Sequence, residues 1–179
     1  FAPSYKIYGL CFSPYKDEQS PNNNAQISEQ QIIEMLDIIV PYTSWIRTFG
    51  MDNGLENIPR IAHGKGLKVA AGAWISDIHA ANQTQILKLI EKAKQGHVDI
   101  AVVGSEVILR NNLTPAQLIA LINQVKDSLP DIKVTTDDVY GTFLAHPELM
   151  NAVDLIMANI YPYWEGVEVD CAPKFINYT

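Results

Sequence analysis

One glutamate stands out in this sequence because of the apolar residues that precede it. The segment Asp99-Ile-Ala-Val-Val-Gly-Ser-Glu-Val-Ile-Leu-Arg110 runs through β-branched residues to a glycine, and Glu106 follows two residues later. Such a run predicts a strand that is buried on both faces, as in parallel sheets flanked by helices. An ionised carboxylate at the end of that strand costs free energy unless it has a use, so Glu106 is a candidate for proton transfer. The alternative is a partly exposed glutamate that caps the next loop.

Polar and aromatic residues also follow the other predicted strands. Aromatic rings offer flat faces suited to the C–H surface of a sugar, and carboxylate and amide groups can bond its hydroxyls. Beside Glu106, the candidate substrate-binding residues at these strand ends are Arg47, Trp74, Asp77, Asp137, Asn159, Tyr161, Tyr163 and Trp164. Each aromatic residue taken singly fits ordinary packing at a rim. Four of them together with a glutamate and an arginine favour carbohydrate chemistry.

Other kinds of site lack the residues that they need. The four histidines show no ligand spacing, so no metal site is predicted, and no cofactor is expected. The two lysines near strands lie where strands begin, which argues against a Schiff-base enzyme. No glycine-rich phosphate loop follows a strand, and no serine lies in a nucleophile elbow. The residues concerned are His63, His79, His97, His146, Lys68 and Lys133.

The elements that would position these residues alternate between strand and helix. Strands are predicted over 6–15, 44–50, 67–76, 99–108, 132–138 and 154–162, and helices over 28–40, 55–64, 80–95, 114–129 and 147–153. Successive strand–helix units indicate a parallel α/β fold, because parallel neighbours need a crossover connection. The choice lies between an open doubly wound sheet and a closed (β/α)8 barrel. Polar residues at every strand end and the lack of a phosphate loop favour a TIM barrel, of which residues 1–179 form a single, partial catalytic domain with about six β/α units.

Composition limits the partners of this chain. A formal charge of −7 over 179 residues, with no cluster of Lys and Arg, argues against nucleic acid as a partner, and no apolar run reaches the length of a membrane span.

The two cysteines, Cys11 and Cys171, are too few to define a disulfide framework, and we expect them to pack as small hydrophobic residues rather than to pair. The chain begins Phe-Ala-Pro without an initiator Met, so the numbering is expected to start after a processed leader or at a cloning boundary.

Four segments together resemble glycoside hydrolase family 17, the β-1,3-glucanases and glucanosyltransferases built on a (β/α)8 barrel. Val102-Val-Gly-Ser-Glu-Val-Ile-Leu-Arg110 with Asn112-Leu-Thr114 is similar to the strand that carries the family's acid/base, and Trp45-Ile-Arg-Thr-Phe-Gly50 to its second strand. Asn159-Ile-Tyr-Pro-Tyr-Trp-Glu-Gly166 resembles the sixth strand and its loop, and Gly9-Leu-Cys-Phe-Ser-Pro-Tyr15 the first. Many members carry Asn, which contacts the sugar 2-hydroxyl, where this chain has Ser105; the serine is similar to the fungal cell-wall branch and some bacterial relatives.

The resemblance implies a retaining glycoside hydrolase or transglycosylase that acts on β-1,3-linked glucan, with Glu106 as general acid/base and Ser105 beside the substrate. The nucleophile of that family is a glutamate after the seventh strand, expected here beyond residue 179, because Glu165, Glu168 and Asp170 match no family position. We therefore expect the 179-residue chain to be incomplete and inactive by itself, with a further segment or a second chain completing the barrel. A secreted, periplasmic or cell-envelope location is expected. The competing reading is a non-catalytic glucan-binding barrel module, and a third is a barrel fragment without a ligand.

Overall fold

The computed structural model describes residues 6–179, which form one parallel sheet wound in the order of the chain. Its strands are β1 (Ile7–Cys11), β2 (Thr43–Arg47), β3 (Lys68–Ala73), β4 (Ile100–Ser105), β5 (Lys133–Val139) and β6 (Met157–Asn159), and the order across the sheet is β1-β2-β3-β4-β5-β6. All five neighbouring pairs are parallel. An open doubly wound sheet would reverse its strand order partway, whereas a barrel adds each strand beside the last. The predicted partial (β/α)8 fold is confirmed.

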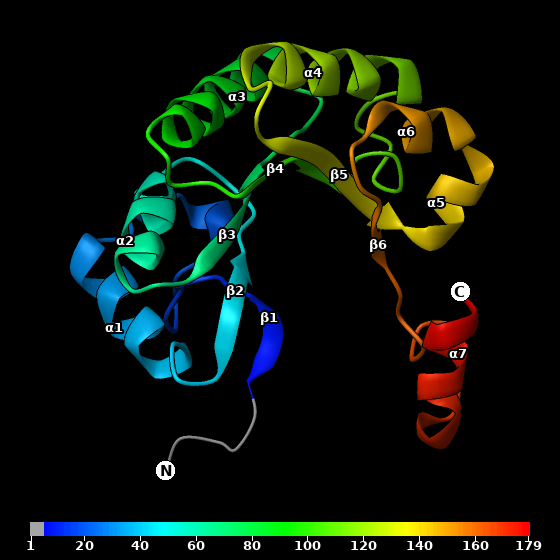
Figure 1. Ribbon diagram of the computed structural model, residues 1–179, viewed down its shortest axis with the longest axis horizontal. Coiled ribbons are helices and arrows are strands. Elements are labelled where there is room, and N and C mark those ends of the chain that lie inside the picture. Colours follow the sequence, from blue (N-terminus) through cyan, green and yellow to red (C-terminus); the bar gives the residue numbers. More distant parts are fainter. Residues whose placement is uncertain (1–5) are drawn as a thin grey trace.

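Helices cover the outer face of this curved sheet. Figure 1 shows the strands as an arc, with the helices between successive strands on its convex side and the concave side open. The helices are α1 (Glu29–Ile39), α2 (Ile58–Gly64), α3 (His79–Lys94), α4 (Pro115–Ser128), α5 (Tyr140–Ala145), α6 (Pro147–Ala152) and α7 (Ala172–Tyr178), with 3-10 turns η1 (Pro21–Asn23), η2 (Leu55–Asn57) and η3 (Val169–Cys171). None of the helices in residues 6–179 has both the length and the apolar character that a bilayer crossing requires.

Two helix starts follow directly from local sequence. The Ser28 hydroxyl accepts a hydrogen bond from the backbone N–H of Gln31, so α1 begins where the capping signal predicts. At the start of α4, Thr114 and Gln117 cap each other reciprocally, and Pro115 occupies the first turn, where its missing N–H is not needed. These caps fix the points at which the chain leaves the rim and returns along the outside of the sheet.

The core lies between the sheet and the helices. Ile32 and Leu36 of α1, Leu89 of α3, and Leu118 and Ile122 of α4 are fully buried against the strands. The middle strands are buried on both faces, and from Val69 to Ala73 and from Ala101 to Gly104 every residue is buried. The edge strands differ. Ile7 and Tyr8 of β1 are exposed, because β1 has a strand on one side only in this sheet.

Several sequence-based expectations are wrong in detail. The first and last predicted strands are much shorter, at five and three residues, because residues 12–15 after β1, and residues 154–156 and 160–162 on either side of β6, do not continue the strand. Helices α5 and α7 were not predicted, since both are short. Cys11 and Cys171 are indeed unpaired, but both are exposed rather than packed, because β1 lies at a sheet edge and η3 lies outside the core.

Candidate active site

The backbone at the end of β4 turns sharply to present Glu106. The register between β4 and β5 shifts between Val102 and Ser105, and Gly104 has a φ of 82°, which favours glycine. A Cβ at Gly104 would lie 2.3 Å from a methyl carbon of Val107, so the site also lacks room for a side chain. Glu106 itself has a φ of 51°, an uncommon conformation for a non-glycine residue and one that clusters at functional sites. Its N–H donates to the carbonyl of Asp137 on β5 at 2.8 Å, which ties the turn to the next strand.

Asp138 and Arg110 hold this turn from two sides. The buried carboxylate of Asp138 accepts hydrogen bonds from the N–H groups of Ile108 at 3.0 Å and Leu109 at 3.4 Å, and from the Thr142 hydroxyl. The guanidinium of Arg110 donates from Nε and Nη2 to the carbonyl oxygen of Ser105, at 3.1 and 2.8 Å. These contacts fix the segment after β4 before any ligand is bound.

The carboxylate of Glu106 meets two donors from the end of β6. Its Oε1 accepts hydrogen bonds from Nδ2 of Asn159 at 2.8 Å and from the hydroxyl of Tyr161 at 3.0 Å. Burial and the hydrogen bond to Glu106 raise the pKa of Tyr161 to about 12, so this phenol stays a donor at physiological pH. Glu106 is half-buried at the rim of the sheet, where a ligand can reach it.

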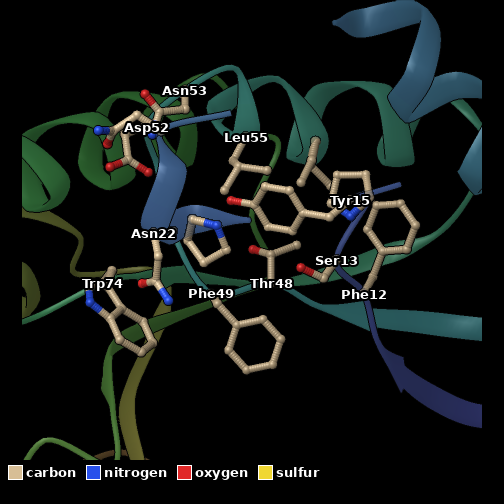
Figure 2. Close-up of a pocket in the computed structure, with 15 residues that line it drawn as sticks. Phe12, Ser13, Tyr15, Asn22, Thr48, Phe49, Asp52, Asn53, Leu55 and Trp74 are labelled. Atoms are coloured by element: carbon tan, nitrogen blue, oxygen red, sulfur yellow. The ribbon is translucent and has the colours of Figure 1, made fainter. Parts of the chain in front are cut away.

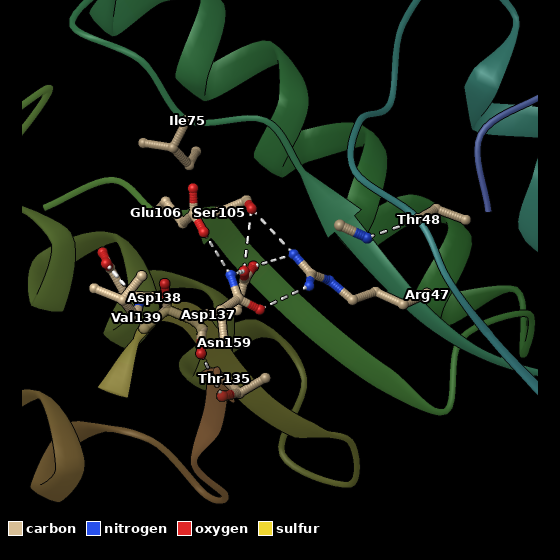
Figure 3. A network of polar contacts seen from close by, with 12 residues as sticks. Arg47, Thr48, Ile75, Ser105, Glu106, Thr135, Asp137, Asp138, Val139 and Asn159 are labelled. Atoms are coloured by element: carbon tan, nitrogen blue, oxygen red, sulfur yellow. Dashed lines mark hydrogen bonds and ion pairs between the residues drawn. The ribbon is translucent and has the colours of Figure 1, made fainter. Parts of the chain in front are cut away.

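Beneath Glu106 lies an ion pair between Arg47 of β2 and Asp137 of β5 (Figure 3). The Asp137 side chain is 0% exposed and that of Arg47 is 14% exposed, with 2.5 Å between Nη2 and Oδ1. Nη2 of Arg47 also donates to the Ser105 hydroxyl at 3.0 Å, and that hydroxyl donates to Oδ2 of Asp137 at 3.1 Å. Asn159 Nδ2 donates to the same Oδ2 at 2.9 Å. Burial raises the pKa of Asp137, while Arg47 and the hydrogen bonds from Asn159 and Ser105 oppose that rise.

The predicted site residues lie in four separate places. Arg47, Ser105, Glu106, Asp137, Asn159 and Tyr161 converge in one hydrogen-bonded cluster at the carboxyl ends of the strands. Trp74, at the end of β3, stacks on the guanidinium of Arg110, whose carbon lies 4.3 Å from the ring centroid. Tyr163 and Trp164 are strongly exposed beyond β6. Their rings pack edge to face, with 5.3 Å between the ring centroids. Asp77 lies elsewhere, in a hollow that it shares with His79 and Leu113.

Asp137 has a different environment from the one that its sequence position suggests. We expected it to bond substrate hydroxyls, but its carboxylate contacts only protein groups and is covered by them. Reasoning from the sequence assigned no role to Arg110 and Asp138, which hold the turn. For Asp138 a signal was present, because alternate residues of a strand point to opposite faces, so of the two adjacent aspartates Asp137 and Asp138 one must face inward and one outward.

The described residues hold no group of three or more His, Cys, Asp or Glu side chains that could bind a metal ion. Glu165, Glu168 and Asp170 are exposed in the segment after β6, away from the hydrogen-bonded cluster. The cluster therefore offers one accessible carboxylate, Glu106, which can give up and regain a proton beside two fixed donors. Directly below it, a second carboxylate is neutralised by an arginine.

Comparisons with protein families and with known proteins find sequences similar to this chain. The family model of the BtgE/BtgC glycoside hydrolase domain matches residues 9–179. A glucan 1,3-beta-glucosidase from Saccharomyces cerevisiae is 30% identical over 148 residues, covering 73% of this chain and 47% of the relative. A putative glucan endo-1,3-beta-glucosidase, btgC, from Aspergillus niger is 31% identical over 189 residues, covering 96% of this chain and 27% of the relative.

Solved structures with a similar fold include members of glycoside hydrolase family 17. The crystal structure of a glycoside hydrolase family 17 beta-1,3-glucanosyltransferase from Rhizomucor miehei superposes with a TM-score of 0.81 at 28% identity, covering 96% of this chain and 64% of that one. An active-site mutant of the Rhizomucor miehei beta-1,3-glucanosyltransferase, in complex with laminaritriose, gives the same TM-score at 27% identity. The chain thus spans less than two thirds of the length of each of these relatives.

Proposed function

Since the chain belongs to the BtgE/BtgC glycoside hydrolase domain family, within glycoside hydrolase family 17, we propose that it carries the acid/base half of a retaining active site for β-1,3-linked glucan. Support comes from the names of its relatives, which are glucan glucosidases and a glucanosyltransferase. The likeness of the fold to a structure solved with laminaritriose supports a β-1,3-glucan as the substrate. A β-1,3-glucan of this kind would occur in a cell wall or outside the cell. We therefore propose a secreted, periplasmic or cell-envelope location.

The observation that carries the proposal is the pair of hydrogen bonds to Glu106. Both Asn159 and Tyr161 donate to Oε1, which leaves Oε2 to hold the proton that is transferred. Glu106 would first protonate the glycosidic oxygen as the bond to the leaving sugar breaks. It would then remove a proton from water in hydrolysis, or from a sugar hydroxyl in transglycosylation. The two donors stabilise the carboxylate that exists between these steps.

The ion pair below Glu106 has a positioning role in this proposal. Asp137 holds Asn159 by one oxygen and Arg47 by the other, so the amide that contacts Glu106 cannot rotate freely. Asp137 is not the nucleophile, because its carboxylate is buried and neutralised. A retaining mechanism needs a second carboxylate about 5–5.5 Å from the acid. We propose that this nucleophile is a glutamate outside residues 6–179.

The test is the substitution Glu106→Gln in the complete gene product. The amide keeps the oxygen that accepts from Asn159 and Tyr161 but cannot transfer a proton, so release of reducing sugar from β-1,3-glucan should fall by about 100-fold or more. A glycoside with an activated aryl leaving group needs little protonation, so the variant should lose less activity on it. Glu168→Gln, at an exposed carboxylate in the segment after β6, is the matched control and should keep full activity. Full activity of Glu106→Gln on glucan would overturn the assignment.

A second candidate, a glucan-binding module without catalysis, is favoured by one observation. Tyr163 and Trp164 form an exposed aromatic pair beyond β6, a surface that suits sugar rings without any carboxylate. Binding of laminari-oligosaccharides measured by calorimetry, together with no turnover by the complete gene product, would support the module. Turnover that disappears in Glu106→Gln would exclude it.

A further inference from the structure

Arg110 lies four residues after Glu106 and joins the chain on either side of it to the neighbouring strand. Its Nη2 donates to the carbonyl oxygens of Ser105, at the end of β4, and of Ile75, just after β3, at 2.8 and 2.9 Å. Its Nε donates to the Ser105 carbonyl again, at 3.1 Å. The backbone N–H of Arg110 donates to the carbonyl of Glu106 at 2.9 Å, which closes the turn. One residue therefore contacts the Glu106 segment before and after the glutamate and ties it to the end of β3.

The guanidinium of Arg110 has little freedom to leave this position. Arg110 is half-buried, and the ring of Trp74 covers its guanidinium, with 4.3 Å between Cζ and the ring centroid. Its Nη1 donates to Oδ1 of Asn112, so every nitrogen of the guanidinium has an acceptor. The planar fork of an arginine is pre-organised and loses less side-chain entropy per hydrogen bond than a lysine does. Arg110 is thus a rigid connection between two strand ends.

Trp74 reaches Arg110 from the wall of a cavity rather than from the core. The cavity lies between residues 12–24, residues 48–58 and Trp74, and Figure 2 shows Trp74 beside Asn22 in this wall. Trp74 is 42% exposed, so burial does not fix its ring. The contact with Arg110 gives the ring a partner, and the ring in turn shields one face of the guanidinium from water.

The positive charge of Arg110 has no ion-pair partner among residues 6–179. The acceptors of its guanidinium are two carbonyl oxygens and one amide oxygen, all of them neutral. Arg47 differs, because it is paired with the buried Asp137. Burial lowers the pKa of Arg110, and the charge of Glu106 is the largest influence that opposes this change. Since an arginine keeps its proton in proteins, a fixed positive charge remains near Glu106.

We infer that Arg110 is a positioning residue for the acid/base: its fork holds the turn that aims the Glu106 side chain, and its charge lies near the carboxylate. The inference rests on the proposed function for the reaction that Glu106 performs. The φ of 51° at Glu106 is unfavourable for a residue other than glycine, and such a conformation persists only where the surrounding contacts enforce it. The contacts of Arg110 enforce it from the side of β3. The charge of Arg110 attracts the carboxylate that forms once Glu106 has given up its proton.

The experiment compares two substrates of the complete gene product. A β-1,3-glucan oligosaccharide has a leaving sugar that needs a proton, whereas laminaribiose linked to an activated aryl group has a leaving group that needs little. Arg110→Lys keeps the positive charge, but a single ammonium cannot reproduce the fork or its stack on Trp74. This variant should lower kcat/KM about 10- to 100-fold on the oligosaccharide and less than about 3-fold on the aryl glycoside. Arg60→Lys, in the exposed pair with Glu29, is the matched control and should leave both values unchanged.

A double variant separates positioning from a general structural role. Because Arg110 acts through Glu106, adding Arg110→Lys to Glu106→Gln should change kcat/KM on the oligosaccharide by less than about 2-fold. Asn112→Ala removes only the acceptor of Nη1 and should cause the same selective loss to a smaller extent, so it decides the question if Arg110→Lys does not fold. Equal losses on the two substrates, or losses that multiply in the double variant, would overturn the positioning role and leave the proposed function standing.

Hydrogen exchange gives a second measurement, which does not depend on turnover. In Arg110→Lys the amides of Glu106 and Ile108, which donate to Asp137 and Asp138, should exchange faster than in the wild type. The amide of Val134, at the opposite end of β5, should exchange at the same rate in both. Unchanged exchange at Glu106 and Ile108 would overturn the inference. If these amides exchange faster but the wild type has no turnover, the role of Arg110 in holding Glu106 stands and the catalytic proposal fails.

Discussion

The ion pair between Arg47 and Asp137 should dominate the response of this fold to mutation. Asp137 is fully buried and Arg47 nearly so, and Asp137 also takes hydrogen bonds from Ser105 and Asn159. Removing one partner of a buried pair leaves an uncompensated charge and typically costs about 3–5 kcal/mol. A domain of this size has a free energy of unfolding of about 5–15 kcal/mol, so either Arg47→Met or Asp137→Asn should remove a large part of it. The melting temperature should fall by roughly 6–20 °C, at about 2–4 °C per kcal/mol.

A double-mutant cycle identifies the source of this loss. Urea unfolding followed by circular dichroism would be measured for Arg47→Met, Asp137→Asn and the double variant. Because the double variant leaves no buried charge, it should lose less than the sum of the two single variants. The exposed pair Lys16 and Glu34 supplies the control, since Glu34→Gln there should leave the urea unfolding curve nearly unchanged.

The pH dependence adds a second check on the same pair. Burial already raises the pKa of Asp137, and Arg47→Met removes a main opposing influence. A carboxyl whose pKa is higher in the folded than in the unfolded state stabilises the fold as the pH falls toward its unfolded value, about 3.9. The deficit of Arg47→Met should therefore shrink as the pH falls from 7 toward 4. Single variants that each cost less than about 1 kcal/mol, or additive effects, would refute the buried pair described here.

Three other predictions concern the cluster and its turn. Tyr161, with a pKa of about 12, should ionise at a higher pH than ordinary tyrosines. Its contribution to stability is therefore present below pH 10 and lost as the pH rises toward 12. The difference in tyrosinate absorbance between wild type and Tyr161→Phe, followed against pH, measures this ionisation. Gly104→Ala should cost about 2–5 kcal/mol in urea unfolding because of its φ of 82° and the contact with Val107, whereas Gly66→Ala, with φ 79° and open space, should cost about 1–2 kcal/mol. Asn159→Ala should lower kcat/KM about 10- to 150-fold through loss of a hydrogen bond to a charged group, and unchanged kinetics would remove this residue from the mechanism.

The sequence predicted the architecture because the signals for it are local. The β-branched run before Glu106, the capping residues Ser28 and Thr114, and the alternation of strand and helix each depend on neighbouring residues. The convergence of Arg47, Glu106 and Asn159 followed from the fold alone, because parallel strands present their carboxyl ends at one rim.

The sequence did not predict burial at the site, because burial depends on which side chains meet across strands. Asp137 and Asp77 look alike in the sequence, yet Asp137 is sealed beneath Arg47 while Asp77 lies in a separate hollow. The positive φ of Glu106 was equally inaccessible, since it follows from the register shift between β4 and β5. The cavity beside Trp74 forms because a loop near residue 22 lies against a loop near residue 53. Patterns of neighbouring residues in the sequence do not predict such a contact.

The chain-ordered winding of the sheet has a consequence for synthesis on the ribosome. Each strand pairs with one that left the exit tunnel only a few tens of residues earlier: Ile7 lies opposite Thr43, and Asp137 lies opposite Met157. Such short separations let each unit dock as it emerges, because little chain entropy is lost per closure. The polar cluster can form only later in synthesis. Arg47 leaves the ribosome before Asp137, and Asn159 leaves after both. The core between the sheet and the first helices can therefore pack before the residues of the candidate active site have all been synthesised.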